Sequence, residues 1–293
     1  MEDKILSVDQ LQNIKEFQKN EITECNIYAR LAKKTRNKEN KKILKKISNE
    51  ELAHYHFWEK YTNTKVSPNR LKILFYYLIA RIFGLTFGIK LMERGETKAQ
   101  YNYNNFQHII PGAAKIALDE DAHEKELIGL INEEKLNYMG SVVLGLNDAL
   151  VELTGTLAGL TFALQNTRII ALVGLVTGIA AGLSMAASEY LSTKSEESAN
   201  EAWKSALYTG IAYFFTVIVL IVPYFIFAHY LVCLGITILL AILVIYFFNY
   251  YISVAKDLNF RKRFVEMLVI SLGVAVISFG IGLLIRKIFG VEV

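Results

Sequence analysis

Apolar residues recur every three or four positions through the first 138 residues, which is the spacing of amphipathic helices. Four helices are expected, over residues 7–35, 37–61, 92–106 and 112–136. Ser7 is a plausible N-cap for the first helix, and Pro111 opens the last one. Pro68 lies in a polar break after the second helix. This part of the chain is therefore predicted to form a four-helix bundle.

Residues 71–91 form a strongly apolar and aromatic segment between the second and third predicted helices, in addition to the four helices of the bundle. Arg81 lies at its middle, and a charge at the centre of a membrane span costs about 3 kcal/mol on insertion scales. Gly84 and Gly88 weaken the helix further. We therefore expect a single crossover helix that leans either on the bundle or on the membrane surface.

Five long apolar stretches follow, each long enough to cross about 30 Å of hydrocarbon. They cover residues 140–164, 168–190, 205–227, 229–253 and 265–286. The N-terminus is charged and amphipathic and does not resemble a signal peptide, so the stretch that begins near Met139 is expected to act as an internal signal anchor. The predicted fold class is all-α, a four-helix bundle followed by a five-helix transmembrane domain.

The distribution of charge divides the chain at the same place. Of the 60 Asp, Glu, Lys and Arg residues, 42 lie in residues 1–138 and 18 in residues 139–293. We therefore predict a soluble domain over 1–138 and a membrane domain over 139–293. The basic residues are interleaved with acids and no nucleic-acid module is present, so nucleic acid is not an expected partner. Cys25 and Cys233 form no CxxC pair and suggest no disulfide framework.

Charges between the apolar stretches predict the orientation. Two loops on the side of the N-terminal domain hold six basic residues, and the opposite side holds three. The six are Lys194, Lys204, Lys256, Arg261, Lys262 and Arg263, and the three are Arg168, Arg286 and Lys287. By the positive-inside rule, the N-terminal domain is cytoplasmic and the C-terminus lies outside the cell membrane.

Two Glu-x-x-His units lie on two of the predicted helices of the first domain. Residues three apart share a helix face, so each unit offers a carboxylate and an imidazole to one point. With carboxylates from the other two helices they make the ligand set of di-iron carboxylate bundles. The predicted ligands are Glu21, Glu51, His54, Glu93, Glu96, Glu120 and His123. The register is open, because Glu50 and Asp119 lie four residues before His54 and His123 and could serve as ligands in place of Glu51 and Glu120. These donors suit iron or manganese.

The membrane domain carries ionisable groups inside its spans, where they are costly and default to functional roles. Asp148 and Glu152 lie one turn apart in the first span, with no Lys or Arg partner within the spans. Met185 and Glu189 are spaced in the same way in the second span. A cation or a proton must therefore compensate the carboxylates.

Residues 10–136 resemble the rubrerythrin branch of the ferritin-like superfamily. The resemblance rests on the predicted ligands and on Tyr28, seven residues after Glu21. It implies a non-haem di-iron site that reacts with peroxide or oxygen, and a Tyr28 side chain that reaches toward a metal-binding glutamate. The cysteines of rubredoxin that feed electrons to classical rubrerythrins are missing here. This favours iron binding, ferroxidation or sensing over peroxidase turnover.

Residues 139–290 resemble the vacuolar iron transporter family. The carrying patterns are Gly-Leu-Asn-Asp-Ala-Leu-Val in the first span and Ser-Met-Ala-Ala-Ser-Glu-Tyr in the second. The resemblance implies a homodimer whose first spans line a pathway, ion contacts at Asp148, Met185 and Glu189, and exchange of Fe²⁺ for protons. Fused to a ferritin-like domain, it looks like the membrane-bound ferritin architecture, which exports iron.

Three functions follow from these patterns. The leading one is a transporter that exports Fe²⁺, and also Mn²⁺, from the cytosol by proton exchange, with the N-terminal bundle gathering, oxidising or sensing iron. The second is a membrane-tethered ferroxidase or peroxidase of the rubrerythrin type. The third is a regulatory module that senses iron and gates the spans. Unpaired carboxylates at Asp148 and Glu152 argue against spans that serve only as an anchor.

Overall fold

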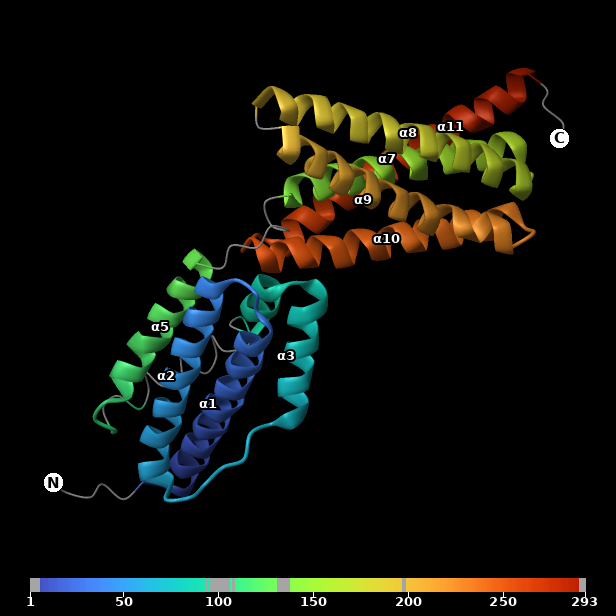
Figure 1. Ribbon diagram of the computed structural model, residues 1–293. Helices are drawn as coiled ribbons and strands as arrows, with labels where there is room; N and C mark the ends of the chain where they lie inside the picture. The colour runs from blue at the N-terminus through green and yellow to red at the C-terminus, as the bar shows by residue number, and fades with distance from the viewer. Residues whose placement is uncertain are drawn as a thin grey trace. The chain divides into compact units, whose positions relative to one another are not determined.

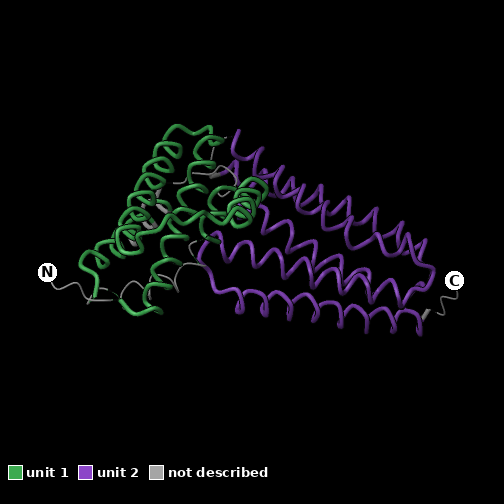
Figure 2. The backbone as a smooth tube through the Cα atoms, turned by 90° about the horizontal axis from the view of Figure 1, so that it is seen from below, with its two compact units in different colours: residues 1–133 green, residues 134–293 purple. Residues whose placement is uncertain are grey.

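The computed structural model is all-helical and separates into two compact units, residues 1–133 (unit 1) and residues 134–293 (unit 2) (Figure 1). Figure 2 colours the two units. The structure describes residues 6–92, 94, 106, 109–130, 138–196 and 199–289. The predicted third helix, residues 92–106, lies almost wholly outside the described residues.

Unit 1 is built on two long helices that lie side by side, α1 (Val8–Lys34) and α2 (Lys38–Thr62) (Figure 1). Ser7 caps α1 in a capping box with Gln10, which confirms the predicted start of the helix. Asn37 caps α2 by accepting two backbone N–H groups. The apolar faces of both helices are buried against each other, as their spacing predicted.

The expected single helix over residues 71–91 is wrong, because the chain breaks at Gly84. Helix α3 (Arg70–Phe83) ends there, and residues 85–92 form a second helix. Gly84 has a φ of 106°, which a residue with a side chain rarely adopts. After the break the two helices touch, since a Cβ on Gly88 would lie 2.5 Å from Cβ of Ala80. Neither helix is among those long enough to span a membrane.

Helix α5 (Ala113–Leu130) is the last described helix of unit 1 and agrees with the first part of the predicted helix over 112–136. It follows a turn in which Gly112 has a φ of 99°. A Cβ at this position would lie 3.0 Å from the ring of Phe57, so the glycine also permits a close approach to α2. Helix α5 packs against α2, which brings the second Glu-x-x-His unit next to the first.

Unit 2 consists of five helices that are long and apolar enough to cross a membrane, which confirms the five predicted stretches. They are α7 (Met139–Leu164), α8 (Thr167–Glu196), α9 (Ala199–Ile226), α10 (Tyr230–Ala255) and α11 (Phe260–Phe289). Helix α7 contacts each of the other four, so it is the central helix of the unit. Many apolar side chains of α8 to α11 face outward, as expected for helices that meet lipid.

Glycines let the helices of unit 2 approach closely. At Gly145 a Cβ would collide with the backbone carbonyl of Thr209, so α7 and α9 cross almost in backbone contact. On α8, a Cβ at Gly178 would lie 2.7 Å from Val217, and one at Gly182 would lie 3.0 Å from the ring of Tyr213. Gly178 and Gly182, four residues apart, thus mark the face of α8 that packs against α9.

Candidate functional site

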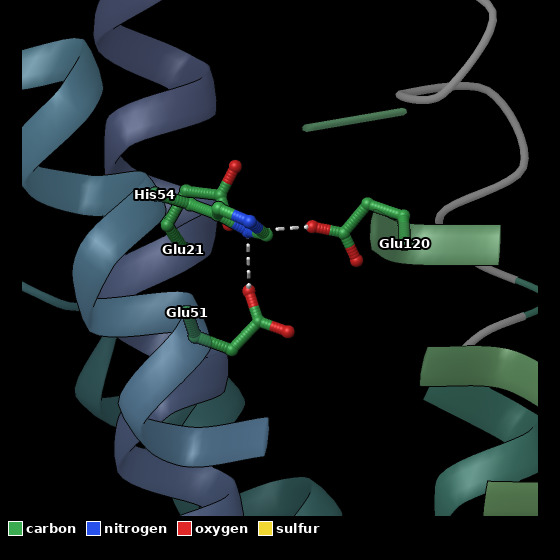
Figure 3. A group of neighbouring side chains, drawn as sticks. All are labelled: Glu21, Glu51, His54 and Glu120. Atoms are coloured by element: carbon green, nitrogen blue, oxygen red, sulfur yellow. Dashed lines mark ion pairs between the residues drawn. The ribbon is translucent and has the colours of Figure 1, made fainter. Parts of the chain in front are cut away.

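The centre of unit 1 holds a group of four side chains that could bind a metal ion, Glu21, Glu51, His54 and Glu120. One ligand atom from each lies within 4.8 Å of the others. Figure 3 shows these side chains pointing toward one another from α1, α2 and α5. Glu21 and Glu51 are each 1% exposed, so two carboxylates are held away from water. Such burial is costly unless protons or metal ions balance the charge.

His54 lies among the carboxylates. Its Nδ1 is 3.1 Å from Oε1 of Glu120 and 3.7 Å from both Oε2 of Glu21 and Oε2 of Glu51. Nδ1 of His54, Oε2 of Glu51 and Oε1 of Glu120 are all buried, and none makes a contact with hydrogen-bond geometry. These possible ligand atoms therefore lie close together without forming hydrogen bonds to one another, as expected of side chains arranged to bind a cation.

His123 extends the group on the side of α5. Its Nδ1 lies 3.3 Å from Oε1 of Glu51 and 3.8 Å from Oε2 of Glu120. The rings of His54 and His123 are stacked with centroids 5.8 Å apart. Glu51 thus offers one oxygen to each histidine, which is the position of a carboxylate that could bridge two ions.

Glu50 and Asp119 occupy an outer position and do not replace the inner carboxylates. Nε2 of His123 hydrogen-bonds to Oε2 of Glu50 at 2.8 Å, with the imidazole donating. Nε2 of His54 lies 3.5 Å from Oδ2 of Asp119. Each histidine therefore turns Nδ1 inward and Nε2 toward a carboxylate of the opposite helix. Outer partners of this kind fix the tautomer and orientation of metal-binding histidines.

Trp58 also belongs to the site, although it was not among the predicted site residues. Its Nε1–H donates to Oε1 of Glu21 at 3.1 Å, and the indole is fully buried. Trp58 lies four residues after His54, on the same face of α2. That spacing, next to a Glu-x-x-His unit, was the available signal.

Burial and mutual contact shift the ionisation of these groups. Desolvation raises the pKa of Glu21 well above its ordinary value, although contact with His54 lowers it. Burial alone would lower the pKa of both histidines, but the surrounding carboxylates outweigh it: the pKa of His54 is strongly raised and that of His123 rises to about 10. Burial opposes ionisation of Glu120, yet the two histidines lower its pKa overall. Without metal, the raised pKa values therefore favour the cationic imidazolium form of both histidines at neutral pH.

A cavity of about 560 Å³ opens beside the cluster between α2 and α5. Its lining includes both histidines, both outer carboxylates, Lys46 and Lys115. Because both histidines line it, a small ion or an oxidant could reach the cluster from this side.

Three predicted site residues of unit 1 are not part of the described cluster, namely Glu93, Glu96 and Tyr28. Glu93 and Glu96 lie outside the described residues. Tyr28 is 2% exposed and belongs to the apolar core formed with Ile27, Leu31 and Leu44. Five of the seven predicted ligands are thus found together, from three helices.

In unit 2 the four residues predicted for the transport pathway lie on α7 and α8. Asp148 is partly buried, and Glu152 is exposed on the surface of the single chain, where its Oε2 accepts a hydrogen bond of 3.0 Å from the hydroxyl of Tyr213 on α9. Glu189 accepts a hydrogen bond of 2.7 Å from the hydroxyl of Ser141, which ties α8 to the start of α7. Met185 is partly buried against the apolar core of the unit.

Comparison with known proteins adds to this geometry. The model of the VIT family matches residues 139–202 and 196–283. The match lies within unit 2 and includes all four of these pathway residues. No curated protein and no solved structure matches the chain significantly.

Proposed function

Because unit 2 is a VIT family domain built on five membrane-capable helices, we propose that the chain is an integral membrane protein that transports divalent iron, and manganese as a second substrate. The observation that carries the proposal is the pair Asp148 and Glu152 on one face of α7. Carboxylates inside a span are expensive unless they serve ion or proton movement. Their hard oxygen atoms suit Fe²⁺ and Mn²⁺.

Proton exchange follows from the same residues. Each carboxylate binds either a proton or the cation, so loading the ion displaces a proton and its departure allows one to return. Tyr213 holds one oxygen of Glu152, which leaves the other oxygen to the substrate. The soft sulfur of Met185 and the carboxylate of Glu189 lie one turn apart on α8 and would extend the path.

The exposure of Glu152 supports a homodimer. In a single chain this carboxylate, in the middle of an apolar helix, would meet lipid. A second copy packed along α7 would cover it and would put two sets of carboxylates on one pathway. Loop charges support a cytoplasmic N-terminal unit and a C-terminus outside the cell membrane. Export as the direction of transport rests on the resemblance to the membrane-bound ferritin architecture.

Unit 1 is proposed to be a ferritin-like, rubrerythrin-type bundle that gathers iron for unit 2. Buried carboxylates and inward Nδ1 atoms form a donor set that fits iron or manganese. Glu21, Glu51, His54, Glu120 and His123 would hold two ions, with Glu93 and Glu96 completing the set. Bound iron would supply redox chemistry toward oxygen or peroxide. Glu50 and Asp119 hold the imidazoles in orientation from outside.

Transport by purified chains in proteoliposomes tests the proposal. With a pH gradient imposed, Fe²⁺ should enter vesicles that contain the protein, while an internal pH dye reports protons leaving. Empty vesicles give the background. Iron entry without proton movement would overturn the exchange mechanism, and the absence of iron entry would overturn transport.

The cavity beside the histidines favours a second candidate, a membrane-tethered ferroxidase. It gives a small oxidant access to the cluster. If Glu51→Ala abolishes oxygen-dependent oxidation of Fe²⁺ and leaves flux through unit 2 intact, oxidation and transport are separable. Loss of both activities in this variant would mean that the cluster supplies the transported ion and does not act only as an enzyme.

A further inference from the structure

Helix α3 has two faces of opposite character. Ile73 and Ala80 are 2% and 6% exposed and pack in the core of unit 1 with α1 and α2. Five large apolar side chains share the opposite face and are each between 45% and 80% exposed: Leu71, Leu74, Phe75, Leu78 and Ile82. Their spacing of three, four, seven and eleven residues puts them in one stripe along the helix.

Basic residues flank this stripe on both sides. At 100° per residue, exposed Arg70 and Arg81 fall along one edge, and partly exposed Lys72 falls along the other. Residues 60–92 contain six basic residues and no Asp or Glu. Within residues 60–92, the charged residues beside the apolar stripe are therefore all positive, unlike the mixed charges of α1 and α2.

An exposed stripe of five large apolar side chains is unfavourable in contact with water, so a partner surface is expected to cover it. Interfacial helices combine an apolar face, buried at the boundary between headgroups and acyl chains, with Lys and Arg on the polar side. Long basic side chains reach outward from such a helix to the phosphates. A second copy of unit 1 fits less well, because two α3 helices would bring Arg70, Lys72 and Arg81 against the same cations.

We propose that α3 is a membrane-docking helix, whose exposed stripe inserts into the surface of a bilayer rich in anionic phospholipid. At 14 residues α3 is about 21 Å long, too short to cross about 30 Å of hydrocarbon. It therefore lies on the bilayer. The five spans of the same chain keep a bilayer within reach, so weak docking suffices. The proposal does not depend on metal transport.

A fluorescent label on α3 tests the docking directly. In the full-length chain with Cys25→Ser and Cys233→Ala, Phe75→Cys is labelled with an environment-sensitive dye, and the protein is reconstituted into nanodiscs. Lipids brominated on the acyl chain should quench this label at least about twofold in anionic discs. A label at Lys45→Cys, on the exposed charged face of α2, is the matched control and should stay unquenched.

Charge variants complete the test. Replacing Arg70, Lys72 and Arg81 together by Gln should reduce the quenching at position 75, as should discs of zwitterionic lipid alone. The same change at exposed Lys33, Lys34 and Lys38 should leave it unaltered. Equal labelling of positions 75 and 45 with no quenching of either would overturn the proposal. So would quenching that is independent of these charges, or, in unlabelled chains reconstituted into liposomes, a disulfide between two Phe75→Cys chains that replaces lipid contact.

Discussion

The hydroxyl of Tyr213 on α9 donates a 3.0 Å hydrogen bond to Oε2 of Glu152 on α7. The tyrosine ring reaches this position because Gly182 on α8 carries no side chain, and a Cβ there would lie 3.0 Å from the ring. Three helices thus fix one carboxylate in the middle of a membrane span. A fixed carboxylate can present its second oxygen to an ion at constant geometry, which makes Tyr213 a positioning residue for the proposed pathway.

Removing that hydroxyl should slow transport without loss of the fold. Tyr213→Phe keeps the ring packing but deletes a hydrogen bond worth about 1 kcal/mol, so we expect about a fivefold lower initial rate of Fe²⁺ uptake in proteoliposomes. Tyr224→Phe is the matched control. It deletes a buried hydroxyl that pairs with Thr161 and touches no carboxylate, and it should keep its rate. Equal rates for both variants would remove Tyr213 from the pathway.

The metal content of the chain should depend on Glu51. Because its two oxygens face both histidines, Glu51→Gln should lower bound iron from about two ions per chain to below one. Elemental analysis of the loaded, detergent-purified protein measures this. Glu59→Gln is the control, since Glu59 pairs with exposed His56 away from the cluster. Wild-type protein that retains no iron would refute the metal site itself.

The outer carboxylate Glu50 should tune the site without being a ligand. Glu50→Gln weakens the hydrogen bond to Nε2 of His123, and outer-partner changes of this kind typically cost 10- to 100-fold in metal affinity, so we expect roughly tenfold weaker binding at unchanged stoichiometry. Competition with a chelator measures the affinity. A lost equivalent of metal would instead make Glu50 a direct ligand.

Metal binding by unit 1 should release protons at neutral pH. His123, with a pKa of about 10, and His54, whose pKa is also raised, are protonated in the metal-free site. Metal requires the neutral imidazole, so apparent affinity should rise as pH increases from 6 toward 9. Calorimetry in two buffers of different ionisation enthalpy counts the protons. Heats that are independent of the buffer would mean that the histidines stay protonated or do not bind.

The crossing of α7 and α9 should tolerate no added methyl group. Gly145→Ala places Cβ against the backbone carbonyl of Thr209, which cannot move aside as a flexible side chain would. Overpacking of this kind costs about 1–3 kcal/mol, so thermal denaturation in detergent should shift to lower temperature. Gly273→Ala on α11, where nothing lies within 4 Å, should leave the transition unchanged. A stable Gly145→Ala protein would show that the two helices can separate.

Much of this organisation was predictable because it rests on local pattern. Ser7 capping α1, the five apolar spans, and the shared face of Glu51 and His54 all follow from spacings within one helix. The break at Gly84 was not predictable, because a glycine in an apolar run fits either a continuous helix or a turn. The turn is distinguished only by the contact that it creates, in which Gly88 packs against Ala80.

Contacts between residues far apart in the sequence could not be predicted either. Glu50 pairs with His123, 73 residues away, and Tyr213 with Glu152, 61 residues away. Such pairs depend on the register in which two helices pack. This register cannot be inferred from residue spacing within one helix. The sequence therefore predicted candidate ligands that lie together in unit 1, but it did not predict the residues that orient them.

The initial rate of Fe²⁺ uptake by Asp148→Asn proteoliposomes is the decisive measurement for transport through unit 2. The variant keeps the size of the side chain but can neither bind a proton as a carboxylate does nor balance the charge of the ion. Asp257→Asn, between α10 and α11 and outside the spans, is the matched control. Asp148→Asn should lose uptake while Asp257→Asn retains it. Uptake by Asp148→Asn at the wild-type rate would mean that this carboxylate carries neither the ion nor the proton.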